Sequence, residues 1–141
     1  MKINKLKAVW NGTLKEGKGN MDITGYSGPF TFASRFENGK GTNPEELVGA
    51  AQAGCYSMFL SALLSGEGLK PEFIETDASV SLGSDDAGPR IERILLSTRV
   101  KCDGLSQEKF SELSKAAKEK CPISRLYAGG SASLELEAEL V

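Results

Sequence analysis

The 141-residue sequence contains no histidine. Histidine is the general base of Ser-His-Asp and Cys-His enzymes and a very common metal ligand in proteins. Both kinds of catalysis, and metal sites built on imidazole, are therefore excluded. A reactive cysteine in this chain would need another group, and an arginine is the obvious candidate, to stabilise its thiolate.

Cysteine is also scarce, with only three residues. No Cys-x-x-Cys pair is present, which disfavours a zinc site or an iron–sulfur cluster. The basic N-terminal segment is not followed by the apolar stretch of a signal peptide. These features predict a cytoplasmic protein with free thiols and with neither metal nor cofactor.

Charge of one sign is nowhere concentrated. The chain has 17 basic and 19 acidic residues, well mixed, and a formal net charge of -2. Without a basic block or stripe, we expect neither a nucleic acid nor a membrane surface as a partner. The length and the 40% hydrophobic content are ordinary for one soluble domain, here residues 1–141.

The longest apolar stretch runs from Leu47 to Leu64 and includes Cys55. Its length reaches the lower limit for a membrane helix, but Gln52 and several small residues interrupt it. The stretch therefore predicts a helix that is buried on nearly every face. Asn43 can cap this helix and Pro44 suits its first position, and Gly66 follows its expected end at about Ser65.

Alternation of apolar and polar residues predicts the strands, and a 3.6-residue period predicts a second helix. The expected strands are Lys5–Trp10, Met21–Thr24, Phe30–Phe36, Phe73–Leu82, Arg90–Cys102 and Ala132–Val141, and the second helix is Gln107–Lys120. Glycine-rich segments between them predict turns at 11–20, 25–29 and 83–89. This order of strands, helix, hairpin, helix and strand predicts an α+β fold.

Cys55 has two interpretations. It is either a small core residue, as free cysteines often are, or a nucleophile. It lies well beyond the first helical turn, so the helix dipole does not lower its pKa. The best cation for its thiolate is Arg35, which alone would read as a solvated residue of the predicted strand Phe30–Phe36. Glu45 is a third candidate, although a carboxylate at a helix N-terminus needs no further explanation.

Cys121 ends the second predicted helix and precedes Pro122. A helix C-terminus carries partial negative charge and does not favour a thiolate. This position suits a resolving thiol, which attacks a sulfur that is already oxidised, or else a buried residue at a helix end. Cys102 ends a predicted strand, and we interpret it as structural.

Several of these residues occur in motifs with a fixed order. They are Phe-x-Ser-Arg-Phe-Glu at 32–37, Thr-Asn-Pro-Glu-Glu-Leu at 42–47, Ala-Gly-Cys at 53–55 and Cys-Pro-x-Ser at 121–124. Together they resemble the OsmC/Ohr family over essentially the whole chain. The position of the arginine segment is more similar to the osmotically inducible OsmC branch than to the Ohr branch.

The resemblance implies an OsmC-like fold in which antiparallel sheets pack around a long buried helix, and an intertwined homodimer with two active sites at its interface. It also implies a thiol peroxidase of oxidative-stress defence, acting on organic hydroperoxides and more weakly on hydrogen peroxide. Cys55 would be the peroxidatic thiol and Cys121 the resolving thiol, with Arg35 stabilising the thiolate and Glu45 orienting Arg35. A dithiol, either a small molecule or a group on a lipoylated protein, would be the reductant.

Two other functions remain open. The same fold could bind a small molecule or lipid without turnover, or it could act as a redox sensor.

The position of Glu45 in the predicted helix bears on how the site is assembled. Ten helical residues span about 15 Å, so Glu45 is poorly placed to act on Cys55 of its own chain. We expect Arg35 and Glu45 to act in trans across a dimer, unless a kink near Gly54 bends the helix back.

Overall fold

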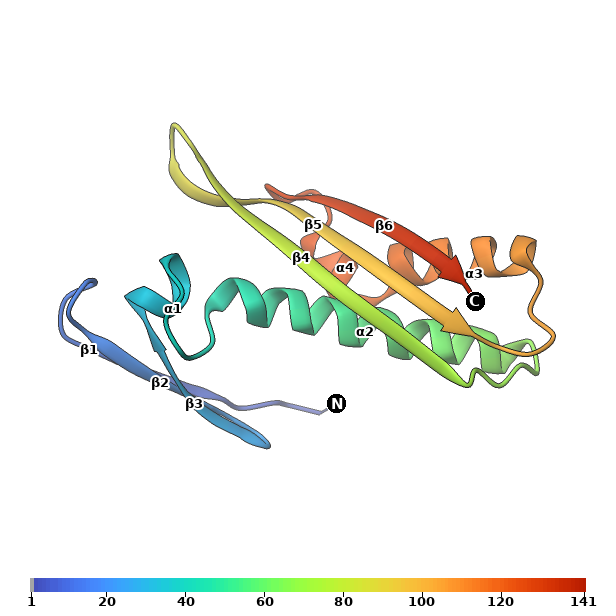
Figure 1. Ribbon diagram of the computed structural model, residues 1–141, viewed down its shortest axis with the longest axis horizontal. Coiled ribbons are helices and arrows are strands. Elements are labelled where there is room, and N and C mark those ends of the chain that lie inside the picture. The colour runs from blue at the N-terminus through green and yellow to red at the C-terminus, as the bar shows by residue number, and fades with distance from the viewer. Residues whose placement is uncertain (1) are drawn as a thin grey trace. The chain divides into compact units, whose positions relative to one another are not determined.

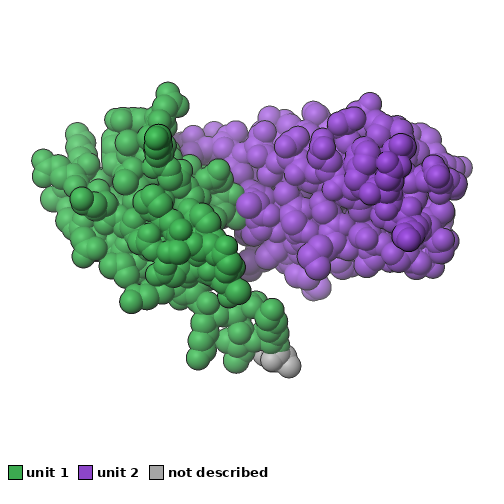
Figure 2. Space-filling view, turned by 60° about the horizontal axis from the view of Figure 1, so that its bottom comes forward, with its two compact units in different colours: residues 1–47 green, residues 48–141 purple. Residues whose placement is uncertain are grey.

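The computed structural model describes residues 2–141 and divides into two compact units, residues up to Leu47 and residues Val48–Val141 (Figure 2). Each unit has one three-stranded sheet, and helices follow or pack on these sheets (Figure 1). The predicted α+β class is confirmed. One domain over 1–141 stays a prediction.

The first unit contains an antiparallel sheet in the order β1-β2-β3. Its strands are β1 (Lys7–Asn11), β2 (Lys18–Ile23) and β3 (Tyr26–Thr31). The first two confirm the predicted strands near these positions, although β2 begins earlier than expected, inside the segment predicted as turns. A tight turn joins β2 to β3, and Gly25 adopts a positive φ of 81° there, as glycine does most easily.

The predicted strand Phe30–Phe36 is wrong in most of its length. Strand β3 ends at Thr31, and a single helical turn, α1 (Phe32–Phe36), follows. Thr31 and Ser34 form a reciprocal capping box, with hydrogen bonds of 3.0 and 2.9 Å between side chain and backbone. This local helix start outweighs the β preference of the aromatic residues. Pro29, expected in a turn, lies instead in β3 at the sheet edge, where it breaks no interior ladder.

Helix α2 (Pro44–Gly66) begins in the first unit and continues into the second. Asn43 caps it as predicted, because its Oδ1 accepts the Glu46 backbone N–H at 2.8 Å. The expectation of burial on nearly every face is wrong for the single chain. Only one stripe is buried, and Met58 is 77% exposed. By length and composition α2 could also span a bilayer, a test that core helices of soluble proteins pass too.

The second unit is built on a long hairpin, β4 (Phe73–Asp85) and β5 (Gly88–Lys101), which confirms the predicted pair of strands. Strand β6 (Ser133–Leu140) then adds to β5 in parallel. An all-antiparallel arrangement of the sheets is therefore wrong for this pair. Two helices between β5 and β6 return the chain to the start of the sheet, and such a crossover allows parallel pairing.

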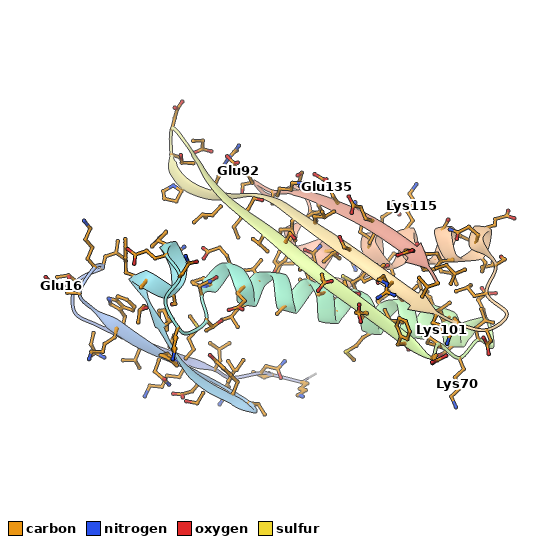
Figure 3. The ribbon with its side chains drawn as sticks, in the orientation of Figure 1. Glu16, Lys70, Glu92, Lys101, Lys115 and Glu135 are labelled. Atoms are coloured by element: carbon orange, nitrogen blue, oxygen red, sulfur yellow. The ribbon has the colours of Figure 1, made fainter. Side chains whose placement is uncertain are left out.

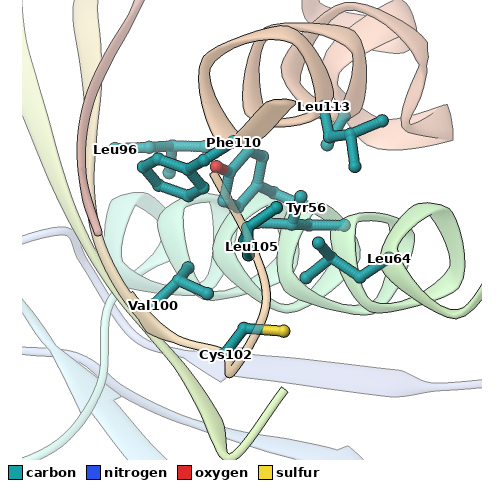
Figure 4. Packing of buried hydrophobic residues seen from close by; sticks show 10 residues of the cluster. Tyr56, Leu64, Leu96, Val100, Cys102, Leu105, Phe110 and Leu113 are labelled. Atoms are coloured by element: carbon teal, nitrogen blue, oxygen red, sulfur yellow. The ribbon is translucent and has the colours of Figure 1, made fainter. Parts of the chain in front are cut away.

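These two helices are α3 (Gln107–Lys120), which has the predicted bounds, and α4 (Pro122–Tyr127), which was not predicted. The core of the unit lies between α2, β5 and α3 (Figure 4). Its fully buried side chains include Tyr56, Leu60 and Leu64 from α2, Leu96 and Val100 from β5, and Phe110 from α3. This packing fixes α2 against the sheet and so sets the position of every residue on its buried stripe.

Ion pairs cover exposed parts of the β4-β5-β6 sheet. Arg93 on β5 pairs with Glu135 on the neighbouring strand β6 at 2.6 Å, and Lys101 pairs with Glu72 at 2.9 Å. Glu135 and Lys101 are labelled in Figure 3. Exposed pairs of this kind contribute little to stability, so the core described above carries most of it.

Gly49 on α2 lies close to strand β4, so a substitution at this residue tests the packing of the helix on the sheet. A Cβ at residue 49 would lie 2.9 Å from Val80 Cγ2 and 3.3 Å from Ala78 Cβ. Gly49→Ala should therefore lower the free energy of unfolding by about 1–2 kcal/mol, despite the better helix propensity of alanine. Gly66→Ala on the same helix meets no atom within 4 Å and should be neutral or slightly stabilising. Urea unfolding of both variants measures the difference, and equal stability would contradict the close packing.

Candidate functional site

Two of the predicted site residues, Cys55 and Cys121, are neighbours in the second unit. Cys55 is half-buried on α2, and Cys121 is fully buried between α3 and α4. Their side chains are close enough for Cys121 to raise the pKa of the Cys55 thiol, and both are free thiols. The fold thus brings together two cysteines that lie far apart in the sequence. A pair of adjacent thiols can form a disulfide when one of them is oxidised.

The pKa of the Cys55 thiol is raised above its ordinary value. Burial is the largest cause, because it disfavours the charged thiolate. The backbone N–H of Ile123, in the first turn of α4, hydrogen-bonds to the sulfur and lowers the pKa, whereas the hydrogen bond and the charge of Cys121 raise it. Ile123 is a contributor that the sequence reasoning missed, because α4 was not predicted.

Cys121 occupies the junction of two helices. Its backbone N–H closes α3 by donating to Ala117 O at 3.0 Å, and its side chain caps the N-terminus of α4. The Cys121 sulfur accepts the Ser124 backbone N–H at 3.3 Å and lies 3.1 Å from Ser124 Oγ. The expectation that this sulfur experiences only a helix C-terminus is therefore wrong, because Pro122 begins a new helix immediately.

Two hydrogen bonds hold α4 on α2 and so fix the separation of the two thiols. Gln52 Nε2 donates to Ser124 Oγ at 3.1 Å, and the Tyr127 hydroxyl donates to the Val48 carbonyl at 3.2 Å. Gln52 precedes Cys55 by nearly one helical turn and is only 1% exposed. Such bonds are effective in the interior, where water does not compete with them.

Arg35 and Glu45 form a close ion pair in the first unit. Arg35 Nη2 lies 2.6 Å from Glu45 Oε1, and Arg35 Nε donates to both carboxylate oxygens at 3.2 and 3.1 Å. The Glu45 side chain is 13% exposed and the Arg35 side chain 35%. Arg35 lies on α1 rather than on a strand, so its predicted element is wrong, and Glu45 is its ion-pair partner in the structure. This two-point pairing holds the guanidinium plane in one orientation.

Local hydrogen bonds position α1 against the start of α2. Ser34 Oγ donates to the Thr42 carbonyl at 2.8 Å, and Asn43 Nδ2 donates to the Ser34 carbonyl at 3.1 Å. Ser34 and Thr42 are both buried. The residues on either side of Arg35 and Glu45 are therefore tied together, and the ion pair rests on a fixed backbone.

A pocket of about 230 Å³ opens beside Arg35 within the first unit. Aromatic rings from three elements line it, including Trp10, Phe30 and Phe36, and the Arg35 guanidinium lies 5.1 Å from the Phe36 ring centre. An apolar wall next to a cation suits a substrate with an apolar body and a polar reacting end. The sequence analysis did not predict this pocket, because the aromatic residues at 30–36 were interpreted only as a strand and nothing linked them to Trp10.

The third cysteine, Cys102, lies in the core, as its interpretation as a structural residue predicts. Cys102 is buried in the core of the second unit, and burial, together with Asp103, raises the pKa of its thiol. Within residues 2–141, histidine, cysteine and carboxylate side chains form no group of three that could hold a metal ion.

The predicted site residues thus form two separate pairs, one in each unit. The thiol pair Cys55 and Cys121 belongs to the second unit, and the ion pair Arg35 and Glu45 belongs to the first. Each pair contains the two residues that the resemblance paired. The thiol pair can react with an electrophilic oxygen and then close a disulfide, and the ion pair offers an oriented cation for developing negative charge.

Comparisons with known proteins agree with these features. The family model described as "OsmC-like protein" matches residues 37–137. Peroxiredoxin OsmC of Escherichia coli (strain K12) is 43% identical over 127 residues, which cover 86% of this chain and 87% of that protein.

Two solved structures share the fold. The organic hydroperoxide resistance protein OhrB of Bacillus subtilis is 26% identical, with a TM-score of 0.67 over 97% of this chain and 98% of that one. An OsmC-like protein from Mycoplasma pneumoniae has a TM-score of 0.79 over 99% and 98% of the two chains, and at 15% identity this likeness concerns the fold alone. The predicted OsmC-like fold is confirmed, and the chain belongs to the OsmC family.

Proposed function

We propose that the protein is a cysteine-based peroxidase that reduces organic hydroperoxides to alcohols. The observation that carries this proposal is the adjacency of the Cys55 and Cys121 thiols across α2 and α4. The names of its relatives, a peroxiredoxin and an organic hydroperoxide resistance protein, support the same activity.

In the first step, the Cys55 thiolate attacks the distal oxygen of ROOH and the O–O bond breaks. Cys55 becomes a sulfenic acid, and the alkoxide takes a proton and leaves as ROH. Arg35, held by Glu45, stabilises the thiolate and the negative charge that develops on the oxygens. Because the guanidinium is already oriented by two-point pairing, little reorganisation is needed when the substrate arrives.

In the second step, the Cys121 sulfur attacks the sulfur of the Cys55 sulfenic acid. A disulfide forms and water leaves. An external dithiol then reopens the disulfide by exchange and restores both thiols. A small dithiol or a lipoyl group on a partner protein has the required chemistry.

The pocket beside Arg35 favours hydroperoxides with an apolar body. Its aromatic wall includes Trp10 and Phe30, whose rings lie in contact range of each other. Binding is favoured when apolar substrate surface leaves water and packs on this wall. Hydrogen peroxide has no such surface, and we therefore expect it to be the poorer substrate.

We also propose a homodimer in which Arg35 and Glu45 of one chain serve Cys55 of the other. Helix α2 is unbroken from Pro44 to Gly66, which speaks against the alternative of a chain bent back near Gly54. The apolar side of α2 that carries Met58 is exposed in the single chain, and a second copy would bury it.

Turnover distinguishes this activity from the two alternatives. Pure protein with dithiothreitol should consume cumene hydroperoxide in many cycles, and faster than hydrogen peroxide. Cys55→Ser should reduce consumption to the background rate, because a serine hydroxyl without a base is a poor nucleophile. The control variant, Cys102→Ala, should retain parental turnover, because Cys102 packs in the core apart from the thiol pair. A protein that binds cumene hydroperoxide without consuming it would be a binding module, and one that reacts about once without recycling would be a sensor.

The role of Arg35 predicts a change in the ionisation of Cys55. Arg35→Met should raise the pKa of Cys55, since the thiolate loses the cation that the trans arrangement brings to it. Arg35→Lys should restore only part of the effect, because an ammonium group cannot bridge a carboxylate and a thiolate as a planar guanidinium can. The measurement is the pH dependence of Cys55 alkylation, followed on the Cys55 peptide by mass spectrometry. The same midpoint in parent and Arg35→Met would place the activating cation elsewhere.

The trans arrangement predicts complementation between two inactive variants. Cys55→Ser and Arg35→Ala are refolded together and assayed with cumene hydroperoxide. In a trans site, each mixed dimer has one site with both intact residues, so mixing should restore up to about half of the parental activity per mixed dimer. In a cis site every site stays defective, and an inactive mixture would overturn the trans arrangement.

A further inference from the structure

Ser124 lies between a buried amide and the Cys121 sulfur. Its Oγ accepts from Gln52 Nε2 at 3.1 Å and lies 3.1 Å from the Cys121 sulfur, which also accepts the Ser124 backbone N–H at 3.3 Å. Gln52, Ser124 and Cys121 are 1%, 3% and 0% exposed. The three side chains form one chain of hydrogen bonds from α2 through α4 to a thiol.

The direction of these bonds depends on the state of Cys121. As a thiol, Cys121 donates its S–H to Ser124 Oγ. As a thiolate it can only accept, so the serine hydroxyl rotates and donates to the sulfur. The Gln52 amide donates into the serine oxygen in both states, which holds that oxygen in place and strengthens the donor capacity of its O–H. The backbone N–H of Ser124 is a second donor to the same sulfur.

We propose that Ser124 is a further catalytic residue for the resolving step, and that Gln52 is the residue that positions it. The proposal rests on the peroxidase function above. Cys121 gives up its proton and attacks the sulfur of the Cys55 sulfenic acid. The S–S bond forms, the S–O bond breaks, and the departing hydroxide takes a proton to leave as water. Ser124 stabilises the Cys121 thiolate that this step consumes.

The side-chain oxygen of Gln52 has no hydrogen-bond partner among the described residues, and this supports a functional role for the residue. This oxygen, Oε1, is also buried. A buried acceptor without a partner costs free energy, and an apolar side chain of similar size would avoid that cost. The Nε2 donor directed at Ser124 gives a reason for an amide at this position.

The experiment separates the two chemical steps. Parent and variants receive one equivalent of cumene hydroperoxide and are quenched at intervals with an alkylating agent. Intact-protein mass spectrometry then follows loss of the Cys55 thiol and gain of the disulfide. Ser124→Ala should leave the first step unchanged and slow disulfide formation about tenfold, the effect expected when one hydrogen bond to a charged group is lost. With excess peroxide it should also accumulate the sulfinic acid at Cys55, as Cys121→Ser should.

Three further variants isolate the cause. Ser124→Thr keeps the hydroxyl and should resolve at close to the parental rate. Ser114→Ala removes another buried hydroxyl, one that contacts only the Ser111 carbonyl, and should change neither step. Gln52→Leu should slow disulfide formation while leaving the loss of the Cys55 thiol at the parental rate.

The outcomes are distinct. Parental disulfide rates in both Ser124→Ala and Gln52→Leu would overturn the proposal. An equal slowing of both steps would also overturn it by indicating a structural role. A parent protein that forms no Cys55–Cys121 disulfide would instead contradict the peroxidase function itself.

Discussion

The hydrogen bond from Gln52 to Ser124 joins two segments that lie 72 residues apart, and the thiol pair depends on it. Helix α2 is fixed by its core packing against β5 and α3, and this bond, with that from Tyr127 to Val48, then fixes α4 on α2. Cys121 caps α4, so the position of α4 sets the position of the Cys121 sulfur. The spacing of the two thiols is therefore set by helix packing, and the cysteines themselves need contribute nothing to holding the fold together.

The ion pair is assembled by a different and more local route. Arg35 and Glu45 are ten residues apart, and the segment between them is tied by the capping box at Thr31 and Ser34 and by the contacts of Thr42 and Asn43. Little chain entropy is lost in bringing the two charges together, because the loop that joins them is short. An oriented cation is thus available before any thiol or substrate approaches, which is the condition for electrostatic stabilisation at low reorganisation cost.

The sequence predicted those features that depend on local chemistry. The start of α2 follows from Asn43 and Pro44, and the bounds of α3 follow from its apolar period and its cap at Ser106. The alternation of apolar and polar residues gave a wrong strand at Phe30–Phe36, because it takes no account of the capping box. It also contains no information on strand direction, so it could not predict the parallel pairing of β6. Pro122 was interpreted only as the end of a helix, although it equally suits the first position of another. The pairing of Gln52 with Ser124 has no sequence signature, and the residues of the site came from family motifs rather than from patterning.

The double role of Cys121 as the cap of one helix and the terminus of another links redox state to local order. A thiol or thiolate sulfur serves α4 as a hydrogen-bond partner at its first turn. A disulfide sulfur has no proton to donate and accepts hydrogen bonds less well than a thiolate. Oxidation would therefore exchange a weak polar cap for a covalent tie between α2 and α4. The six-residue helix would lose part of its own N-terminal cap at the same moment that it becomes anchored, and its reduced conformation would be restored only when an external dithiol releases the sulfur.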